Sequence, residues 1–437
     1  MDIQSLKRRA AAAIDAYAAP VETYLRDIEA HPELGFEEFY TARRMQGFLE
    51  ELGLSPRGGL AVTGVEAVLD SGREGPTIAI MGELDAIFCL GAPHTDPETG
   101  AAHQCGHHVQ QAVMLAVAAG LTRSGVMGAL SGRVKFLGTP AEEAGVFDAA
   151  RLRREGKIHL LTGKAELIRQ GVFDDVDMAM QMHCWSHAPG PLCLCVVRNL
   201  GMLGITARYH GKQAHAASEA YNGVNALYAA TAGIGMVHLL RESFNEADHP
   251  RVHCVLAEGG TNPNSIPDFA RVECYVKANN VPALEALLRR VTGALRAGAQ
   301  ALGAELELEV RPGMLPMRTD ETLSRMYMEN AAGLMPADCI GVQEQQFACS
   351  DLGDVAQLMP VLYPQAGGVD GAGHAADFRV VDFNSAVLLP AKTFAATICD
   401  LLCGGAEAAR AVAAAHTPAM SKQEYLDTME RYFSGNA

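Results

Sequence analysis

The alternation of short apolar strands with helical patterns is the feature of this 437-residue chain that most restricts its fold. Strands are expected at 63–69, 76–82, 133–138 and 177–183, with helix-length patterns before and between them. Such alternation favours an α/β fold, a mostly parallel sheet covered by helices on both faces. Because sites in sheets of this kind lie at the carboxyl ends of the strands, the residues that follow these strands are considered first.

The pattern changes between residues 200 and 315. Strands and helices are expected there in the order β-α-β-β-α-β, the split βαβ or ferredoxin-like arrangement. The segments are 203–210, 222–242, 251–258, 269–277, 281–303 and 304–311. We therefore predict a larger domain in two parts, 1–199 and 316–437, with a complete small domain inserted at 200–315. Helices of the larger domain are expected at 3–18, 20–30, 38–53, 319–333 and 384–403.

Net charge and cysteine content indicate which partners and which cellular compartment to expect. The 35 Lys and Arg against 51 Asp and Glu give a net charge of −16, which argues against a nucleic-acid partner because phosphate binding needs a basic face. Eleven cysteines without a regular framework indicate reduced thiols and a cytoplasmic protein. The alanine-rich N-terminus is interpreted as an amphipathic helix rather than an export signal. No apolar run is expected to cross a membrane.

The string HQCGHH at 103–108 indicates a transition-metal site. Cys105 and His107 are two residues apart, so in extended backbone both side chains face the same way. Thiolate and imidazole are ligands that suit Zn²⁺. The ordinary alternative is a buried cysteine beside a capping histidine. Three histidines around one cysteine favour the metal.

Adjacent carboxylates follow a predicted strand in GTPAEE, residues 138–143. Glu142 and Glu143 point in different directions, so one can bind a metal while the other moves a proton. The alternative is an acidic helix start, where carboxylates interact favourably with the helix dipole.

Further candidates lie far apart in the sequence. His183 ends a predicted strand, and Asp85 follows another and could orient a ligand histidine. His374 lies in the glycine-rich stretch 367–378, where tight backbone paths are possible. His215 belongs to the inserted domain and would matter only if that domain closes over the site.

Together these strings resemble the M20 peptidase family, the two-metal aminoacylases and carboxypeptidases. The resemblance is to the branch, subfamily D, of aminobenzoyl-glutamate hydrolases, indole-acetyl-amino-acid hydrolases and aminoacylase-1-like dipeptidases. Nine motifs occur in the family's order: HPELGFEE (31–38), GELDA (82–86), HQCGHH, GTPAEE, MHCW (182–185), HGKQAHAAS (210–218), GGTNPNSIPD (259–268), CSDLGD (349–354) and GAGH (371–374).

The resemblance implies two divalent ions, Mn²⁺ or Zn²⁺ with Co²⁺ as a further candidate. The five side chains that would hold them are Cys105, His107, Glu143, His183 and His374. Glu142 would be the general base that takes a proton from the metal-bound water and returns it to the leaving nitrogen. Asp85 would orient a ligand histidine without binding an ion itself.

The resemblance also gives the inserted domain a role as lid and dimerisation surface. His215 would stabilise the oxyanion at the site of a partner subunit, and Asn264 would contact the substrate. Lys277 stands where many relatives have an arginine that binds the substrate carboxylate, and lysine keeps the charge without the bidentate fork. The partner could be a second copy or a sister subunit.

We therefore expect a metal-dependent amidohydrolase that cleaves a small N-acyl or N-aroyl amino acid, or an unusual dipeptide, by attack of a metal-bound hydroxide. Two alternatives stay open. The same centre could act on a non-peptide C–N bond such as that of an aryl amine, which Lys277 and the long segment 88–102 allow. The chain could also be a catalytically inactive relative that binds a small molecule, against which the complete set of candidate residues argues.

Overall fold

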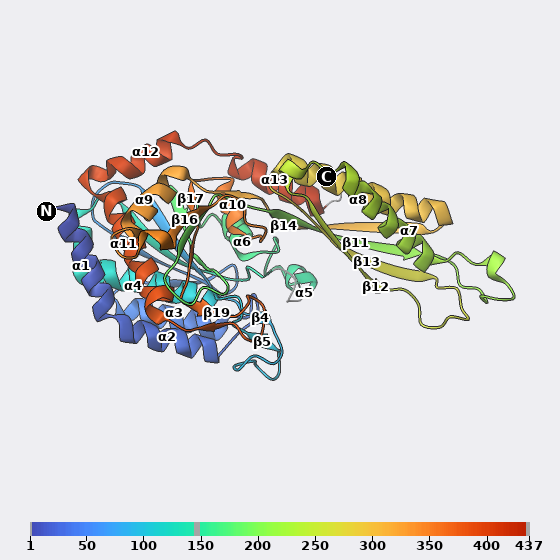
Figure 1. The fold of residues 1–437 in the computed structure, drawn as a ribbon, viewed down its shortest axis with the longest axis horizontal. Coiled ribbons are helices and arrows are strands. Elements are labelled where there is room, and N and C mark those ends of the chain that lie inside the picture. Colours follow the sequence, from blue (N-terminus) through green and yellow to red (C-terminus); the bar gives the residue numbers. More distant parts are fainter. Residues whose placement is uncertain (1, 144–148, 434–437) are drawn as a thin grey trace. The chain divides into compact units, whose positions relative to one another are not determined.

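The computed structural model describes residues 2–143 and 149–433, which fold into two compact units (Figure 1). Unit 1 is formed by 1–198, 318–346 and 354–419, and unit 2 by 199–317, 347–353 and 420–437. The chain therefore leaves unit 1 after residue 198 and returns at 318, close to the boundaries expected from the sequence.

A six-stranded sheet forms the centre of unit 1. Its strands, in order across the sheet, are β1 Arg57–Leu60, β2 Gly64–Asp70, β6 Arg133–Thr139, β3 Thr77–Glu83, β7 Met178–Met180 and β17 Val361–Leu362. The pairs from β6 to β17 are parallel, whereas β1, β2 and β6 pair antiparallel. Every residue of β3 is buried, as expected for a strand covered on both faces. The predicted mostly parallel sheet is confirmed.

Helix α4, His107–Ser124, is the core helix of unit 1. It is buried on all sides from His107 to Leu121 because it lies on β3 and is covered by α1 Ile3–Ala16, α2 Ala18–Ala30 and α11 Leu389–Leu402 (Figure 1). Glycines in the left-handed region begin and end it, Gly106 with φ 96° and Gly125 with φ 66°. Such backbone favours glycine, so the sequence itself sets both ends of the helix.

The segment Asn384–Leu402 is long and apolar enough to cross a membrane, which the sequence analysis did not expect. It is 83% buried inside the protein. It starts with a π-helical turn, Asn384–Leu388, continues as α11, and packs on α1, α4 and α9 Glu321–Ala331. Its apolar character therefore fits a core helix of unit 1.

A second, smaller sheet in unit 1 was not predicted. Its four strands are β16 Ile340–Gln343, β9 Cys193–Val196, β18 Pro364–Ala366 and β8 His183–Cys184. The strands are only two to four residues long, which is too short for a clear alternation of apolar and polar residues. The sheet matters for the site because it fixes the backbone of His183, which pairs with Gln365 of the neighbouring strand β18.

Unit 2 contains a four-stranded antiparallel sheet with two helices. The elements follow the chain as β11 Gly201–His210, α7 Ala226–Leu239, β12 Arg251–Glu258, β13 Phe269–Ala278, α8 Val281–Leu302 and β14 Glu305–Met314. The strand order β12-β13-β11-β14 leaves β12 and β14 as edges. The predicted β-α-β-β-α-β order is confirmed.

Helix α8 shows how the sequence specifies this unit. Asn280 caps its start by accepting a hydrogen bond from the Ala283 N–H at 2.9 Å, and Gly303 ends it in the left-handed region with φ 72°. The buried residues recur at helical spacing: Leu284, Leu287, Leu288, Val291, Leu295 and Ala299. This apolar stripe packs on α7 and on the sheet.

One domain assignment needs correction, because the sequence placed all residues after 315 in the larger domain. Helix α13, Lys422–Phe433, belongs to unit 2. It packs on β14, buries Tyr425 and Tyr432, and Tyr432 Oη lies 3.2 Å from Glu285 Oε1 of α8. Its apolar face shows only that it is buried; which unit it covers is decided by tertiary packing.

Close packing of α7 on α8 yields a stability prediction. A Cβ at Gly298 would lie 2.6 Å from the Ala229 carbonyl oxygen, and backbone cannot move aside cheaply. Gly298→Ala should therefore lower the free energy of unfolding by about 1–3 kcal/mol. Gly293→Ala on the same helix meets nothing within 4 Å and should raise it by about 0.5–1 kcal/mol. Urea unfolding of both variants gives the measurement, and equal effects would contradict the packing argument.

Candidate metal centre

The candidate residues gather at the carboxyl edge of the main sheet of unit 1. β3 ends at Glu83, just before Asp85; β6 ends at Thr139, just before Glu142 and Glu143; and β7 ends shortly before His183. Because β3, β6 and β7 are parallel neighbours, their carboxyl ends meet. Helix α4 starts at the same edge with Cys105 and His107.

Two groups of possible ligands share one thiol. In the first group, ligand atoms of Cys105, His107 and His183 lie within 4.8 Å of one another, and Cys105 Sγ is 3.4 Å from His183 Nε2. In the second group, ligand atoms of Cys105, Glu143 and His374 also lie within 4.8 Å of one another, and His374 Nε2 is 3.0 Å from Glu143 Oε1. The fold therefore brings together all five side chains that the sequence predicts as ligands.

Left-handed backbone directs several of these side chains. Gly106 separates Cys105 from His107, and a Cβ there would lie 3.3 Å from Cys184 Sγ. His374 has φ 65° and donates its N–H to the Gln104 carbonyl at 2.8 Å, which ties the glycine-rich loop to the HQCGHH segment. Positive φ in a residue other than glycine costs free energy and is common at functional sites.

Asp85 connects the two groups of ligands. It is fully buried, and its Oδ1 lies 3.1 Å and its carbonyl oxygen 2.9 Å from His107 Nδ1. Its Oδ2 accepts the Glu143 N–H at 2.8 Å. One carboxylate thus contacts a ring from the first group and the backbone of a carboxylate from the second. Contacts of this kind orient metal ligands, and the supporting role of Asp85 stays a prediction.

The residues present fit a pair of divalent cations. With Nδ1 of His107 engaged by Asp85, its buried Nε2 is left without a hydrogen-bond partner and faces the other ligand atoms. A buried nitrogen in this condition is unfavourable unless something binds it. Thiol, imidazole and carboxylate together are donors that suit Zn²⁺, Co²⁺ or Mn²⁺.

Without a cation, two of the candidate ligands favour their protonated forms. Burial raises the pKa of the Cys105 thiol well above its usual value. Burial opposes the charged form of His107, but its interactions with Cys105, Glu83 and Asp85 outweigh the effect of burial and raise the pKa of this histidine. Because metal ligands must be deprotonated, binding of a cation here would release protons.

Glu142 lies beside the ligand groups and is nearly buried. Its Oε2 is 4.0 Å from His107 Nε2. The turn before it is strained, since Ala141 has φ 45°. Glu38 holds this turn, because its Oε1 accepts the Ala141 N–H at 2.8 Å while Oε2 accepts the Thr63 hydroxyl. Glu38 and Asp85 therefore fix the backbone on both sides of Glu142.

Neither ligand group includes three other histidines, His103, His108 and His187. His103 and His108 are buried with their rings 5.2 Å apart. Burial lowers the pKa of His103 well below its usual value and that of His108 to about 4, so both rings are neutral near pH 7. His187 is mostly exposed and its Nδ1 lies 3.9 Å from Asp370.

In unit 2, the structure places two of the three predicted residues together. Asn264 Nδ2 lies 3.3 Å from His215 Nε2, with His215 in the segment after β11 and Asn264 in the loop between β12 and β13. Lys277 is near the other end of β13, opposite Arg251. Lys277 lies eight positions along the strand from Phe269, a distance of about 26 Å at the usual rise per residue. Lys277 therefore does not share the His215 and Asn264 cluster.

The sequence analysis missed the roles of Glu83 and Glu38. Glu83 is buried, and its Oε2 lies 3.0 Å from His107 Nε2. Its position two residues before Asp85 at a strand end was the available signal, since residues at that spacing face the same way. Glu38 belongs to the HPELGFEE motif, but its partner Ala141 is more than a hundred residues away.

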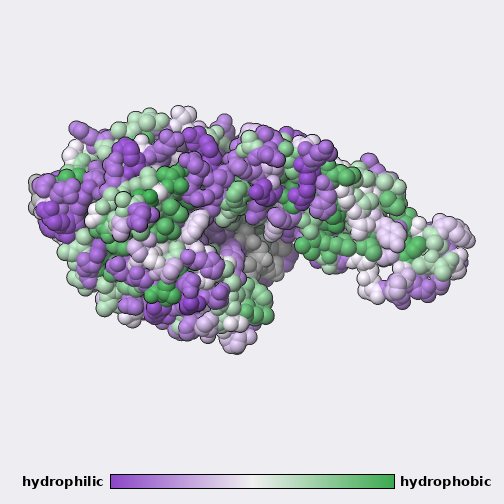
Figure 2. Space-filling view, in the orientation of Figure 1, coloured by the Kyte–Doolittle hydropathy of each residue, from purple (hydrophilic) through white to green (hydrophobic). Residues whose placement is uncertain are grey.

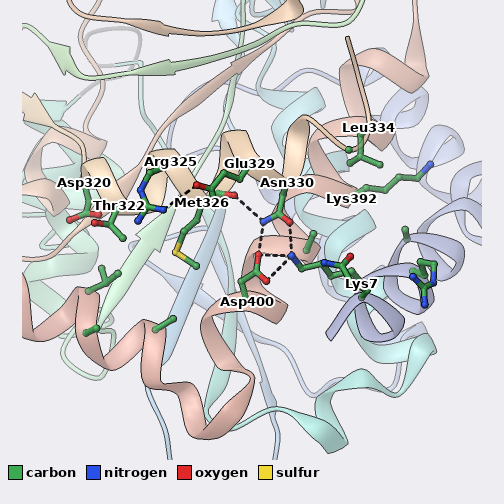
Figure 3. A pocket seen from close by; sticks show the side chains of 18 of the residues that line it. Lys7, Asp320, Thr322, Arg325, Met326, Glu329, Asn330, Leu334, Lys392 and Asp400 are labelled. Carbon is green, nitrogen blue, oxygen red and sulfur yellow. Dashed lines mark hydrogen bonds and ion pairs between the residues drawn. The ribbon is translucent and has the colours of Figure 1, made fainter. Parts of the chain in front are cut away.

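A groove of unit 1 lies away from the candidate ligands. It has a volume of about 1050 Å³ and is lined by α1, α9, α11 and α12 Glu407–Ala415 (Figure 3). Charged groups in it satisfy one another: Lys7 Nζ lies 2.6 Å from Asp400 and 2.8 Å from the Asn330 side-chain oxygen. No candidate ligand lines it.

The chain is similar in sequence to known proteins. Residues 197–301 match the family model of the peptidase dimerisation domain. The chain is 27% identical over 424 residues to the Xaa-Arg dipeptidase of Mus musculus, covering 92% of this chain and 90% of that one. It is 30% identical over 305 residues to one of the subunits of the p-aminobenzoyl-glutamate hydrolase of Escherichia coli K12, covering 67% of this chain and 58% of that one.

Solved structures show the same fold. A dinuclear metal-binding peptidase of the M20 family from Bacillus subtilis superposes with a TM-score of 0.70 at 23% identity, covering 89% of this chain and 99% of that one. An aminobenzoyl-glutamate utilisation protein from Klebsiella pneumoniae gives 0.66 at 18% identity, covering 89% and 97%.

Fold and site together define a metallo-hydrolase that acts on C–N bonds. The chain belongs to the M20 peptidase family.

The buried Glu38 carboxyl should make the metal-free protein lose stability as the pH rises. Burial, with the Asp85 charge nearby, raises the pKa of Glu38 from 4.5 to about 8. Because the folded chain holds this proton more tightly than the unfolded chain, the stabilisation is complete below pH 4.5 and is lost as the pH passes about 8. Glu38→Gln resembles the protonated form and should remove this dependence.

Urea unfolding midpoints of parent and Glu38→Gln, measured from pH 4.5 to 9 after chelation, check this prediction. As the pH rises, the urea midpoint of the parent should fall relative to that of Glu38→Gln. Glu37→Gln, at an exposed neighbour, is the matched control and should follow the parent. A parent and variant that run parallel across the range would refute the assignment.

Proposed function

We propose that this protein hydrolyses the amide bond of a small N-acyl or N-aroyl amino acid, or of an unusual dipeptide, with two divalent cations held by the groups around Cys105. The observation that carries the proposal is the single thiol shared by two ligand groups, with Glu142 beside them. A closed structural site would have no use for a carboxylate that lies next to the ligands.

Each residue then has a chemical task. Bound divalent ions lower the pKa of water and polarise a carbonyl. Glu142 accepts the proton of the attacking water at its carboxylate and donates it to the leaving nitrogen. Asp85 keeps His107 oriented, and Glu38 keeps Glu142 at its place through the backbone of Ala141.

The substrate class rests on the relatives. The mouse protein that matches along most of its length is a dipeptidase for Xaa-Arg, and the E. coli protein belongs to a hydrolase of p-aminobenzoyl-glutamate. Lys277 supports the alternative of a different C–N bond, because lysine lacks the bidentate fork of arginine for a carboxylate. A panel of N-acyl-glutamates, dipeptides and aryl amides separates these, and tight binding without turnover would favour an inactive relative.

Unit 2 would serve as the lid and the dimer surface. Its edge strand β12 exposes backbone groups along one side and apolar side chains, among them Val255 and Leu256. Tyr228 and Leu239 of α7 are also exposed, and hydrophobic surface is visible on this unit (Figure 2). Edges and patches of this kind mark interfaces. We infer a homodimer, in which His215 and Asn264 act on substrate.

The eleven cysteines support a reducing location. All lie in the described part of the chain and each is a free thiol, including Cys254 and Cys274, which face each other across β12 and β13. Free thiols that face each other persist where thiols are kept reduced. We therefore place the protein in the cytoplasm.

Removal of metal should abolish hydrolysis, and Mn²⁺, Zn²⁺ or Co²⁺ should restore it. Glu142→Gln should bind the same number of ions as the parent and lose about 100- to 10,000-fold in kcat, because only the proton transfer is removed. The measurements are metal content and steady-state rates on the same preparations. Normal turnover in a metal-loaded Glu142→Gln protein would exclude this base.

Mixed dimers test the predicted action of His215 on the partner's site. His215→Ala should lower kcat about 100- to 1,000-fold at unchanged metal content, as loss of an oxyanion donor does. Mixing His215→Ala with Glu142→Gln subunits should regain activity, since one site of a mixed dimer then has both groups. Each variant exchanged with itself is the control. No gain on mixing would show that His215 does not act across the dimer.

A further inference from the structure

A buried ion pair lies directly behind His107. Glu83 Oε1 accepts hydrogen bonds from Lys164 Nζ at 2.7 Å and from Gln181 Nε2 at 2.6 Å. The side chains of Glu83 and Lys164 are 1% and 0% exposed. Burying two charges costs free energy that a purely structural pair often fails to recover, and apolar residues could fill the same space. The pair therefore invites a functional explanation.

The second oxygen of Glu83 faces the candidate ligands. Oε2 accepts a hydrogen bond from Gln110 Nε2 at 2.8 Å and lies 3.0 Å from His107 Nε2. That nitrogen is buried and has no hydrogen-bond partner, although the charged oxygen of Glu83 is its close neighbour. Glu142 completes a third group of atoms that lie within 4.8 Å of one another.

The spacing suits two ligands of one cation. Ligand atoms at about 2.1 Å from an ion, at right angles to each other, are about 3 Å apart. A carboxylate oxygen also keeps a free lone pair after accepting one hydrogen bond. With Gln110 on one side, Oε2 of Glu83 can still bind a cation carried by His107 Nε2.

We propose that Glu83 is a further carboxylate ligand of the cation held by His107, and that Lys164 is the positioning residue that turns this carboxylate toward it. The inference rests on the metal centre proposed above. Lys164 and Gln181 occupy Oε1, which leaves only Oε2 for the cation. An added oxygen ligand makes the His107 side of the centre harder, which favours Mn²⁺ more than a site of thiol and imidazole alone.

A double substitution separates a ligand from a structural partner. Glu83→Gln combined with Lys164→Met removes both charges at similar volume, so a purely structural pair should be replaced at little cost. If Glu83 is a ligand, the double variant should bind one ion fewer, or bind it more than about 100-fold more weakly. Calorimetric titration of the chelated full-length chain with Mn²⁺ gives number and affinity, and circular dichroism reports folding.

Glu166→Gln is the matched control. Glu166 is a buried carboxylate of the same unit that is paired with Arg169 and belongs to none of the ligand groups, so this variant should bind Mn²⁺ as the parent does. Glu83→Asp provides a second test, because this variant keeps the negative charge but shortens the side chain by one methylene. Its Co²⁺ form should show a visible absorption spectrum different from that of the parent, since ligand geometry changes.

The outcomes are distinct. A folded double variant that binds two ions with parental affinity, or a Glu83→Asp protein with the parental Co²⁺ spectrum, overturns the role of Glu83 and leaves the metal centre standing. A parent chain that binds no Mn²⁺ or Co²⁺ at all overturns the metal centre itself. Loss of one ion in the double variant, with Glu166→Gln unchanged, supports Glu83 as the ligand.

Discussion

The contact of Asp85 with His107 and with the backbone of Glu143 is the interaction on which the site depends. Asp85 has no exposure to solvent, so its carboxylate must be satisfied by the groups that it touches. It meets both requirements with atoms from two different segments, the imidazole at the start of α4 and the amide after β6. The same contact that satisfies a buried charge thereby sets the spacing of the two ligand groups.

The buried Glu38 carboxyl likewise holds the backbone on the other side of Glu142. Glu38 supports the left-handed Ala141, and Glu33, from the same motif, caps α3 Phe39–Glu51 by accepting the Tyr40 and Thr41 N–H groups at 2.9 and 2.8 Å. The HPELGFEE string therefore contributes two supports and no candidate ligand. Family membership alone says that the string recurs; the hydrogen bonds say what it does.

Sequence patterns predicted the long elements well and the short ones poorly. The helices of the N-terminus and the strands and α-helices of the inserted domain were placed within a few residues, because each buries a face over several turns or a full strand. The small sheet with β8, β9, β16 and β18 was missed, since strands of two to four residues carry no period. Helix α13 was assigned to the wrong unit for a related reason: an apolar helix face indicates that the helix is buried, but it does not indicate against which unit the helix packs.

The sequence by itself determined which residue types were available for the site and on which strand ends they lie: a thiol and an imidazole two apart, paired carboxylates, and histidines after other strands. Those facts follow from local spacing. Only the tertiary structure decided that one thiol serves both ligand groups, that Glu83 with Lys164 lies behind His107, and that Lys277 is far along β13 from Asn264. The reason is physical: a buried charge can exist only where the fold supplies its partners, and those partners lie up to a hundred or more residues away along the chain.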